Sequence, residues 1–235
     1  MMNLDMAFCA PGAAHWLGCD PYGQDLALLI ARGLGRSITV ATAVVALKLL
    51  IALPAGTLLA WAPPLPRAIC LRALDAILAF PGILLAILFA ALLEPGLRSL
   101  IITLAITGWA APARLVQSLV RQNLGLPFVE AARASGAGFA RMHWKTIYPA
   151  LWGQMALYSV HALASAGMAE VALCFLGMGG APDTVSLGHL IAEGRQYLVE
   201  HPRLSLAPGM ALFTFVLALN LAAERVRIRY SLTSQ

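Results

Sequence analysis

Residues 127–149, PFVEAARASGAGFARMHWKTIYP, form a charged segment between long apolar runs. The segment predicts two short helices joined by a hinge, because Gly136 and Gly138 interrupt helix propagation in its middle. Residues 141–148 can form a second amphipathic helix, which Pro149 is expected to end. Since the flanking runs are long enough to cross a membrane, we expect a cytosolic loop that presents a helix of small residues to a partner.

The composition is that of an integral membrane protein. Hydrophobic residues make up 60% of the 235 residues, charged residues make up 11%, and the mean hydropathy is +0.79. A soluble domain of this composition would not stay dissolved. The apolar runs have about the ~20 residues that a membrane-spanning helix needs, whereas the strands of an outer-membrane barrel alternate over ~10 residues. We therefore predict an all-α polytopic membrane protein.

Five apolar segments predict spans, each long enough to cross the bilayer with some tilt. They are residues 38–60, 74–93, 99–118, 151–176 and 206–223. Ahead of the first span, a cluster rich in Gly, Pro and Asp predicts a turn-rich loop, followed by a short amphipathic helix over residues 26–32. We accordingly divide the chain into an extracytoplasmic N-terminal segment, residues 1–36, and a transmembrane domain, residues 37–235.

The distribution of Lys and Arg predicts the orientation. Of the 16 such residues, ten are cytoplasmic if residues 127–149 lie inside, five are outside, and Lys48 lies within a span. The positive-inside rule therefore favours an extracytoplasmic N-terminal segment and a cytoplasmic C-terminus. The basic residues form no patch interleaved with aromatics, which argues against a nucleic-acid partner. The N-terminus lacks the charge pattern of a cleavable signal peptide.

The four cysteines, Cys9, Cys19, Cys70 and Cys174, lie in unrelated segments without CxxC or Cys/His ligand spacing. We therefore predict neither a disulfide framework nor a zinc site.

The loop at residues 127–149 resembles the EAA signature of ABC-importer permeases, E-A-A-x3-G-x9-I-x-L-P. Thr146 stands where the signature prefers Ile, and Tyr148 where it prefers Leu. Both departures lie in the second half of the loop. The matching positions are Glu130, Ala131, Ala132, Gly136 and Pro149.

Other blocks narrow the resemblance to the second permease of peptide and nickel importers. Residues 15–25, HWLGCDPYGQD, resemble that group's H-x-L-G-T-D-x-x-G-R-D motif, with Cys19 for Thr and Gln24 for Arg. Further similar blocks are Arg72-x-x-Asp75 with Ala79-Phe80-Pro81, Trp109-x-x-x-Ala113-Arg114-Leu115-Val116, residues 175–179 (FLGMG) and residues 192–195 (AEGR). The group usually has six spans, with one helix ahead of the first motif. Either that helix is dispensable here, or the start of the chain is truncated or mis-assigned.

The resemblance implies an ABC type I importer permease fold and a division of labour within the EAA loop. The first half would be a coupling helix that sits in a groove of an ATPase subunit, and the second half would anchor the loop to the permease through Tyr148 and Pro149. Closure of the ATPase subunits would then switch the pore between inward- and outward-facing states. Gly136 would need either a φ or a proximity that a Cβ forbids. The coupling residues would be Glu130, Ala131, Ala132, Arg133, Ala134, Ser135 and Gly136.

The resemblance also implies the partners. These are a homologous permease subunit, two ABC ATPase subunits that bind ATP and Mg, an extracytoplasmic substrate-binding protein, and the lipid of the bacterial inner membrane. The chain itself would hold no cofactor and no metal and would not be an enzyme. Its cargo would be a peptide, nickel or a metal chelate, selected largely by the binding protein.

Two charges inside predicted spans, Lys48 and Glu170, are costly in a bilayer. We expect them to pair with each other or with a partner permease, or to line the substrate path. Asp75 is expected to stabilise a helix start. The Met, Cys and imidazole groups near residues 155–178 lack ligand spacing, which favours packing over a nickel site. Candidates for the translocation path are Phe80, Pro81, His161, Met168 and Glu170.

Two alternatives belong to other classes. A secondary transporter would be expected to show inverted repeats or broken helices around a polar midplane site. A non-transporting structural subunit would not need an exposed loop with a glycine hinge. The sequence shows no such repeat and does have such a loop.

Overall fold

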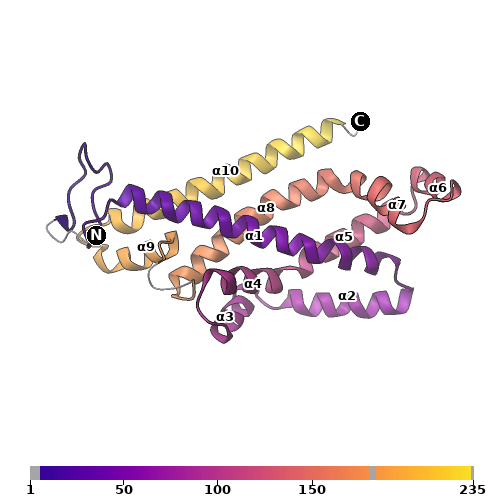
Figure 1. The fold of residues 1–235 in the computed structure, drawn as a ribbon, viewed down its shortest axis with the longest axis horizontal. Helices are drawn as coiled ribbons and strands as arrows, with labels where there is room; N and C mark the ends of the chain where they lie inside the picture. The colour runs from indigo at the N-terminus through magenta and orange to yellow at the C-terminus, as the bar shows by residue number, and fades with distance from the viewer. Residues whose placement is uncertain (1–5, 180–183, 234–235) are drawn as a thin grey trace.

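The computed structural model describes residues 6–179 and 184–233, and these residues form an elongated bundle of helices (Figure 1). Within the described ranges, the β-structure is a single isolated bridge between Cys19 and Asp25. The helices are α1 (Leu26–Trp61), α2 (Pro64–Ala79), α3 (Gly82–Leu92), α4 (Leu97–Gly108), α5 (Ala110–Asn123), α6 (Pro127–Ala134), α7 (Phe139–Met142), α8 (Tyr148–Phe175), α9 (Leu187–Gly194) and α10 (Arg203–Thr233), with a π-helical turn η2 (His143–Ile147) and a 3-10 turn η3 (Arg195–Tyr197).

Three helices are long and apolar enough to cross a membrane, and the number rises to five if each of two bent pairs counts as one span. The predicted all-α fold with about five spans is therefore confirmed. The three long helices are Leu26–Trp61, Phe139–Phe175 and Arg203–Ile228.

Two of the five predicted spans are bent pairs of helices. The segment at 74–93 is divided between α2 and α3, whose axes differ by 84°. Phe80 is extended, with φ −77° and ψ 136°, because the residue before a proline avoids the helical region. The segment at 99–118 bends by 44° between α4 and α5. Pro112 lacks the N–H that would bond to the Gly108 carbonyl across this break.

The opposite difference occurs in α1, where a predicted short helix and the following span form one helix of 36 residues. Asp25 begins it, since its side chain accepts hydrogen bonds from the amides of Ala27 and Leu28. Leu26, Leu29 and Ile30 are buried in a cluster with residues of α9 and α10, and this packing outweighs the weak helix propensity of the nearby glycines. The division between residues 36 and 37 thus falls inside α1.

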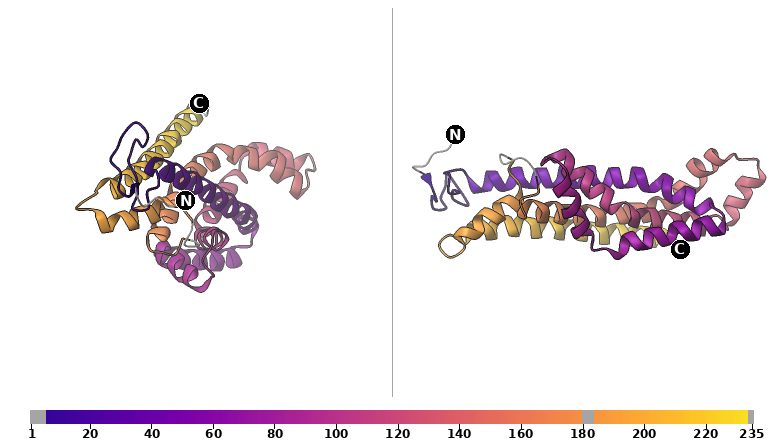
Figure 2. Two further views of the ribbon diagram at one scale, coloured as in Figure 1. Left: turned by 60° about the vertical axis from the view of Figure 1, so that its left-hand side comes forward. Right: turned by 90° about the horizontal axis from the view of Figure 1, so that it is seen from below.

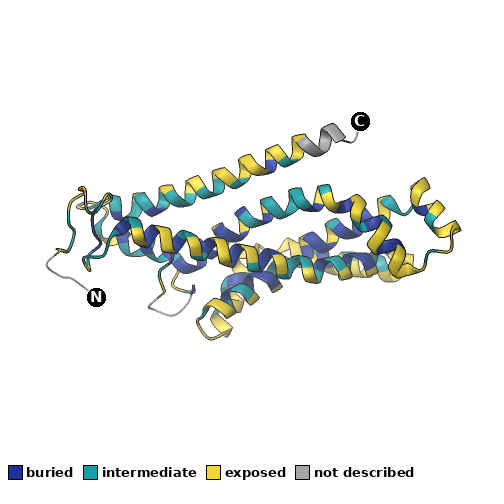
Figure 3. Cartoon of the chain, turned by 45° about the horizontal axis from the view of Figure 1, so that its top comes forward, coloured by how far each residue is buried: buried dark blue, intermediate teal, exposed yellow. Residues whose placement is uncertain are grey.

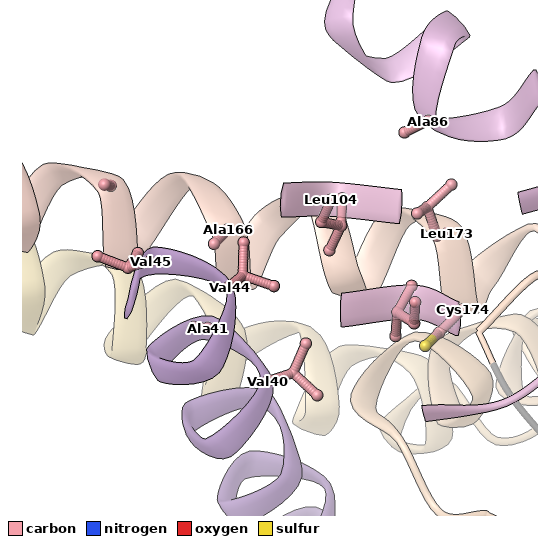
Figure 4. Close-up of a cluster of buried hydrophobic side chains, with 11 residues drawn as sticks. Val40, Ala41, Val44, Val45, Ala86, Leu104, Ala166, Leu173 and Cys174 are labelled. Carbon is pink, nitrogen blue, oxygen red and sulfur yellow. The ribbon is translucent and has the colours of Figure 1, made fainter. Parts of the chain in front are cut away.

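Three clusters of buried side chains follow one another along the bundle. The first joins the start of α1 to α9 and α10. The second joins α1, α4 and α8 through residues such as Val44, Leu104 and Ala166 (Figure 4). The third lies around Val116, Val129 and Ile147.

The two ends of the bundle hold different parts of the chain. The N-terminal loop, α9 and the start of α10 lie at one end, whereas α6, α7 and the end of α1 lie at the other (Figures 1 and 2). We call these the motif end and the loop end. Along its length α10 alternates between intermediate and exposed residues, and few of its residues are buried (Figure 3).

Candidate coupling site

The first half of the EAA loop is the exposed helix α6. Leu126 precedes it in an extended conformation, and Pro127 occupies its first turn, where a missing N–H costs nothing. Val129 is fully buried in the third core cluster and fixes α6 to the bundle. Of the seven predicted coupling residues, Ala132 is half-buried and the others, Glu130, Ala131, Arg133, Ala134, Ser135 and Gly136, are exposed.

The hinge between the halves depends on backbone conformation. Gly136 has φ +75°, in the left-handed region that side chains with a Cβ avoid. A Cβ at this position would meet nothing within 4 Å, so conformation rather than crowding requires glycine. At Gly138 a Cβ would also meet open space, and φ is −65°. The amides of Gly136 and Ala137 bond back to the carbonyls of Arg133 and Ala132, at 3.0 and 3.1 Å, and so end α6.

The second half continues directly into α8, so the prediction that Pro149 ends a helix is wrong. Pro149 lies in the first turn of α8, directly after η2. The π-helical turn changes the hydrogen-bond register, and the N–H that proline lacks is then not needed. Pro149 is exposed, whereas the Tyr148 hydroxyl lies 3.0 Å from the Thr57 hydroxyl of α1.

An aromatic cluster joins this half to the end of α1. The indole Nε1 of Trp61 donates to Nε2 of His143 at 2.8 Å. Phe139 contacts both rings, with centroids 5.5 Å from Trp61 and 4.1 Å from His143. The Arg133 guanidinium lies 5.8 Å from the centroid of the Trp61 ring. Sequence reasoning missed Trp61, because nothing in its local sequence indicates a partner 82 residues away.

At the motif end, the residues of the predicted H-x-L-G motif fold on one another. His15 Nδ1 lies 2.8 Å from the Asp25 carboxylate, and Asp20 accepts from the amides of Tyr22 and Gln24 at 2.9 and 2.7 Å. The hydrogen bond with His15 lowers the pKa of Asp25, and the amides of Leu28 and Ala27 act in the same direction. The stabilisation from this carboxylate is therefore present at neutral pH and is lost as the pH falls through the lowered pKa.

A disulfide joins Cys9 to Cys19, so the prediction that the cysteines form no disulfide is wrong for these two. The tight turns of the motif reverse the chain between them, which their separation of ten residues does not reveal. Arg203 of α10 donates to the carbonyls of Phe8 and Cys9, at 2.8 and 2.7 Å, and holds the loop in place. Among the described residues, the one group with metal-ligand proximity is Cys9, His15 and Cys19, and the disulfide already uses both sulfurs.

Glu170 is fully buried, and its partners lie on α1 and α8. Ser37 donates to it at 2.6 Å, the Cys174 thiol at 3.2 Å, and Arg36 Nε lies 3.8 Å away. Arg36 also donates to the carbonyl of Gly179 in the loop after α8. A pair between Lys48 and Glu170 is therefore not formed. Lys48 instead lies against Gly108, where an added Cβ would be 2.4 Å from its Nζ.

Asp75 lies in the interior of α2 and forms an ion pair with Arg114 of α5, so its predicted role at a helix start is wrong. Charge pairing between the two helices, rather than attraction to a helix dipole, fixes its side chain. Both residues belong to blocks that the resemblance had singled out separately.

The candidates for the translocation path occupy different environments. Phe80 and Pro81 are exposed at the bend between α2 and α3, and His161 and Met168 are exposed on α8. Burial removes Glu170 from that exposed face of α8. The path assignments stay predictions.

Comparisons with known proteins agree on one group. Residues 52–229 match the family of the binding-protein-dependent transport system inner membrane component. The chain is 30% identical to the di/tripeptide transport system permease protein DppC of Pseudomonas aeruginosa, covering 92% of this chain and 71% of that protein. It is 29% identical to the nickel transport system permease protein NikC of Escherichia coli, over 96% and 82%. Its fold resembles an inward-facing MetNI methionine ABC transporter with a TM-score of 0.69, at 20% identity over 86% of this chain and 96% of that one.

Proposed function

Because this chain belongs to the family of binding-protein-dependent transport system inner membrane components, the permease subunits of ABC importers, we propose that it transmits ATPase closure to a membrane pore through α6. Members of this family lie in the bacterial inner membrane and work with ATPase subunits and a substrate-binding protein. ATP hydrolysis is done by the separate ATPase subunits, so the chain is a transporter subunit and not an enzyme.

The observation that carries the proposal is the exposure of α6 beyond its single buried anchor. Val129 packs into the bundle, whereas Glu130, Ala131 and Ala134 are left free to contact a partner. Alanine at two of these positions allows a close approach, and Glu130 offers one charge for pairing. A purely structural membrane subunit has no use for such a helix. Broken helices are expected of a secondary transporter, and this chain has two bent helix pairs. Helix bending therefore does not help to choose between a secondary transporter and an ABC importer subunit.

We assign the loop end to the cytoplasm and the motif end to the outer face. The balance of basic residues supports this orientation. The disulfide between Cys9 and Cys19 supports it too, because disulfides persist in oxidising compartments. The motif end would then meet the binding protein.

A second permease would complete the pore. The supporting observation is a polar stripe on α8, where Gln154, His161 and Ser165 are exposed at helical spacing, with the apolar Met168 exposed at its end. Polar side chains facing lipid are costly, so this stripe and the exposed residues Phe80 and Pro81 fit a pore lined jointly with a homologous permease. Two ATPase subunits would complete the complex.

The proposed cargo is a small peptide, in keeping with the resemblance to a di/tripeptide permease, and a nickel complex is the second candidate. Competition between trialanine and Ni²⁺ for the purified binding protein distinguishes them. Binding of trialanine supports the first cargo, and binding of Ni²⁺ alone overturns it.

The same substitution at two exposed glutamates, Glu130 of α6 and Glu224 of α10, tests the coupling role. In the assembled importer, Glu130→Gln is expected to reduce the stimulation of ATP hydrolysis by the binding protein about tenfold, as lost charge-assisted contacts do. Glu224→Gln removes a carboxylate from the exposed side of α10, where it pairs with Arg227, and is expected to change the stimulation less than twofold. Equal behaviour of the two variants would contradict the proposal.

A further inference from the structure

Trp61, the last residue of α1, contacts successive turns of the EAA loop. Its indole N–H donates to His143 of η2 at 2.8 Å. Its ring lies edge-on to Phe139 of α7, with the centroids 5.5 Å apart. The Arg133 guanidinium of α6 lies 5.8 Å from the ring centroid. One side chain of α1 thus reaches both halves of the loop, across the hinge at Gly136.

The partner of this indole is held in one orientation. His143 is only 2% exposed, and its Nδ1 lies 2.7 Å from the Phe139 carbonyl oxygen. Because an indole N–H can only donate, Nε2 of His143 must be the acceptor. The ring proton is then on Nδ1 and is donated to the carbonyl of Phe139. His143 therefore links the Trp61 side chain to the backbone of α7.

Nearby contacts make this junction continuous with α1. Thr57 lies one turn before Trp61, and its hydroxyl is 3.0 Å from the hydroxyl of Tyr148. Arg121 of α5 reaches the carbonyl of Ala60 at 3.4 Å. From here α1 runs without a break to its N-terminal third, where Arg36 and Ser37 contact buried Glu170.

We propose that Trp61 is the positioning residue through which movement of α6 reaches α1. The inference rests on the proposed function of α6 as the ATPase contact. The hinge at Gly136 lets the two halves of the loop turn relative to each other, and the Trp61 junction restrains that turn. Movement of α6 is thereby passed to a helix that contacts the buried charge cluster around Glu170 through Arg36 and Ser37.

The test separates the indole hydrogen bond from the bulk of the ring. Trp61→Phe retains an aromatic ring and loses the N–H, and Trp144→Phe is the matched control, because Trp144 is 71% exposed in the same loop. ATP hydrolysis by the assembled importer in nanodiscs is measured with and without the purified binding protein. The ratio of the two rates is the stimulation. We expect Trp61→Phe to reduce the stimulation at least fivefold, with unchanged basal hydrolysis and unchanged amounts of complex. Trp144→Phe is expected to stay within twofold of the wild type.

Two replacements of His143 test whether a hydrogen-bond acceptor at this position is enough to keep the stimulation. His143→Gln keeps an oxygen that accepts from Trp61, and is expected to retain most of the stimulation. His143→Phe keeps an aromatic ring without an acceptor, and is expected to behave as Trp61→Phe.

The outcomes separate this proposal from the one on which it rests. Normal stimulation in Trp61→Phe, together with a defect in Glu130→Gln, would leave α6 as the ATPase contact and overturn the role of Trp61. Normal stimulation in both variants would overturn the proposed function itself. A loss of assembled complex in Trp61→Phe, with normal stimulation per remaining complex, would show a packing role only and also overturn the proposal.

Discussion

The two ends of the bundle are fastened by different interactions. At the motif end, a disulfide, an arginine that spans from α10 to the N-terminal loop, and a fully buried glutamate tie segments together. At the loop end, α6 is held by one buried valine and by contacts to an aromatic cluster, on the far side of a glycine hinge. Elements that move are drawn from the less stable parts of a protein. The difference indicates that the loop end is built to shift and the motif end to hold its shape.

The buried charge at the motif end provides the largest predicted effect. Glu170→Ala leaves Arg36 without its carboxylate partner, and removing one member of a buried pair costs about 3–5 kcal/mol. Thermal unfolding in detergent is expected to show this loss. The double variant Arg36→Met/Glu170→Met removes both charges and is expected to recover much of it. A single variant as stable as the wild type would show that the motif end is not fastened by this cluster.

The disulfide ranks second. Replacing Cys9 with Ser opens a short loop, and closing such a loop contributes about 2–3 kcal/mol in the chain-entropy account. Chymotrypsin cleavage of the N-terminal loop, which contains Phe8, Trp16 and Tyr22, is expected to become faster, with little change in the loop at residues 127–149. Cys70→Ser, at an exposed free cysteine, serves as the control. Equal cleavage rates for Cys9→Ser and the wild type would show that the disulfide does not stabilise the motif end.

The hinge at the loop end comes next. Gly136→Ala forces a Cβ into the left-handed region at a cost of about 1–2 kcal/mol, whereas Gly138→Ala meets no such penalty. We expect Gly136→Ala to reduce binding-protein stimulation several-fold and Gly138→Ala to leave it nearly unchanged. If the two alanine variants behaved alike, the conformation of Gly136 would not matter for coupling.

The smallest effect is expected at the ion pair between α2 and α5. Asp75 and Arg114 are 36% and 48% exposed, and pairs of this kind contribute about 0.2–1 kcal/mol. Asp75→Asn is therefore expected to lower the midpoint of thermal unfolding only slightly. The shift should diminish further at high salt, where exposed charges are screened. A loss as large as that of Glu170→Ala would mean that this half-exposed pair stabilises the bundle as strongly as the buried cluster at the motif end.

Periodic and compositional features of the sequence predicted the fold well. Runs of apolar residues located the spans, and the EAA spacing located an exposed helix, a hinge and a return to the bundle. Features that depend on three-dimensional proximity were not predictable. Arg36 lies ahead of the first predicted span, but α1 extends through it and places it beside Glu170. The disulfide depends on how a turn-rich loop closes. Trp61 and His143 meet only in the folded chain.

The bends were missed for a local reason that the sequence does contain. Phe80 precedes Pro81, and this pair restricts the backbone enough to end α2, but the apolar run across it favoured one uninterrupted helix. Pro149 is the opposite case, because the sequence predicts a helix end there and the proline instead lies in the first turn of α8. In both cases the position of proline relative to the helix start decides its effect.

Crosslinking during ATP hydrolysis tests the central claim most directly. In a background in which Cys70 is replaced by Ser, Ala134→Cys places a thiol on the exposed side of α6, and Leu65→Cys places one at the exposed start of α2 at the same end of the bundle. With a cysteine in the groove of the ATPase subunit, the account predicts a crosslink to residue 134 that stops binding-protein stimulation and is reversed by reduction. A crosslink to residue 65 with none to residue 134 would contradict it.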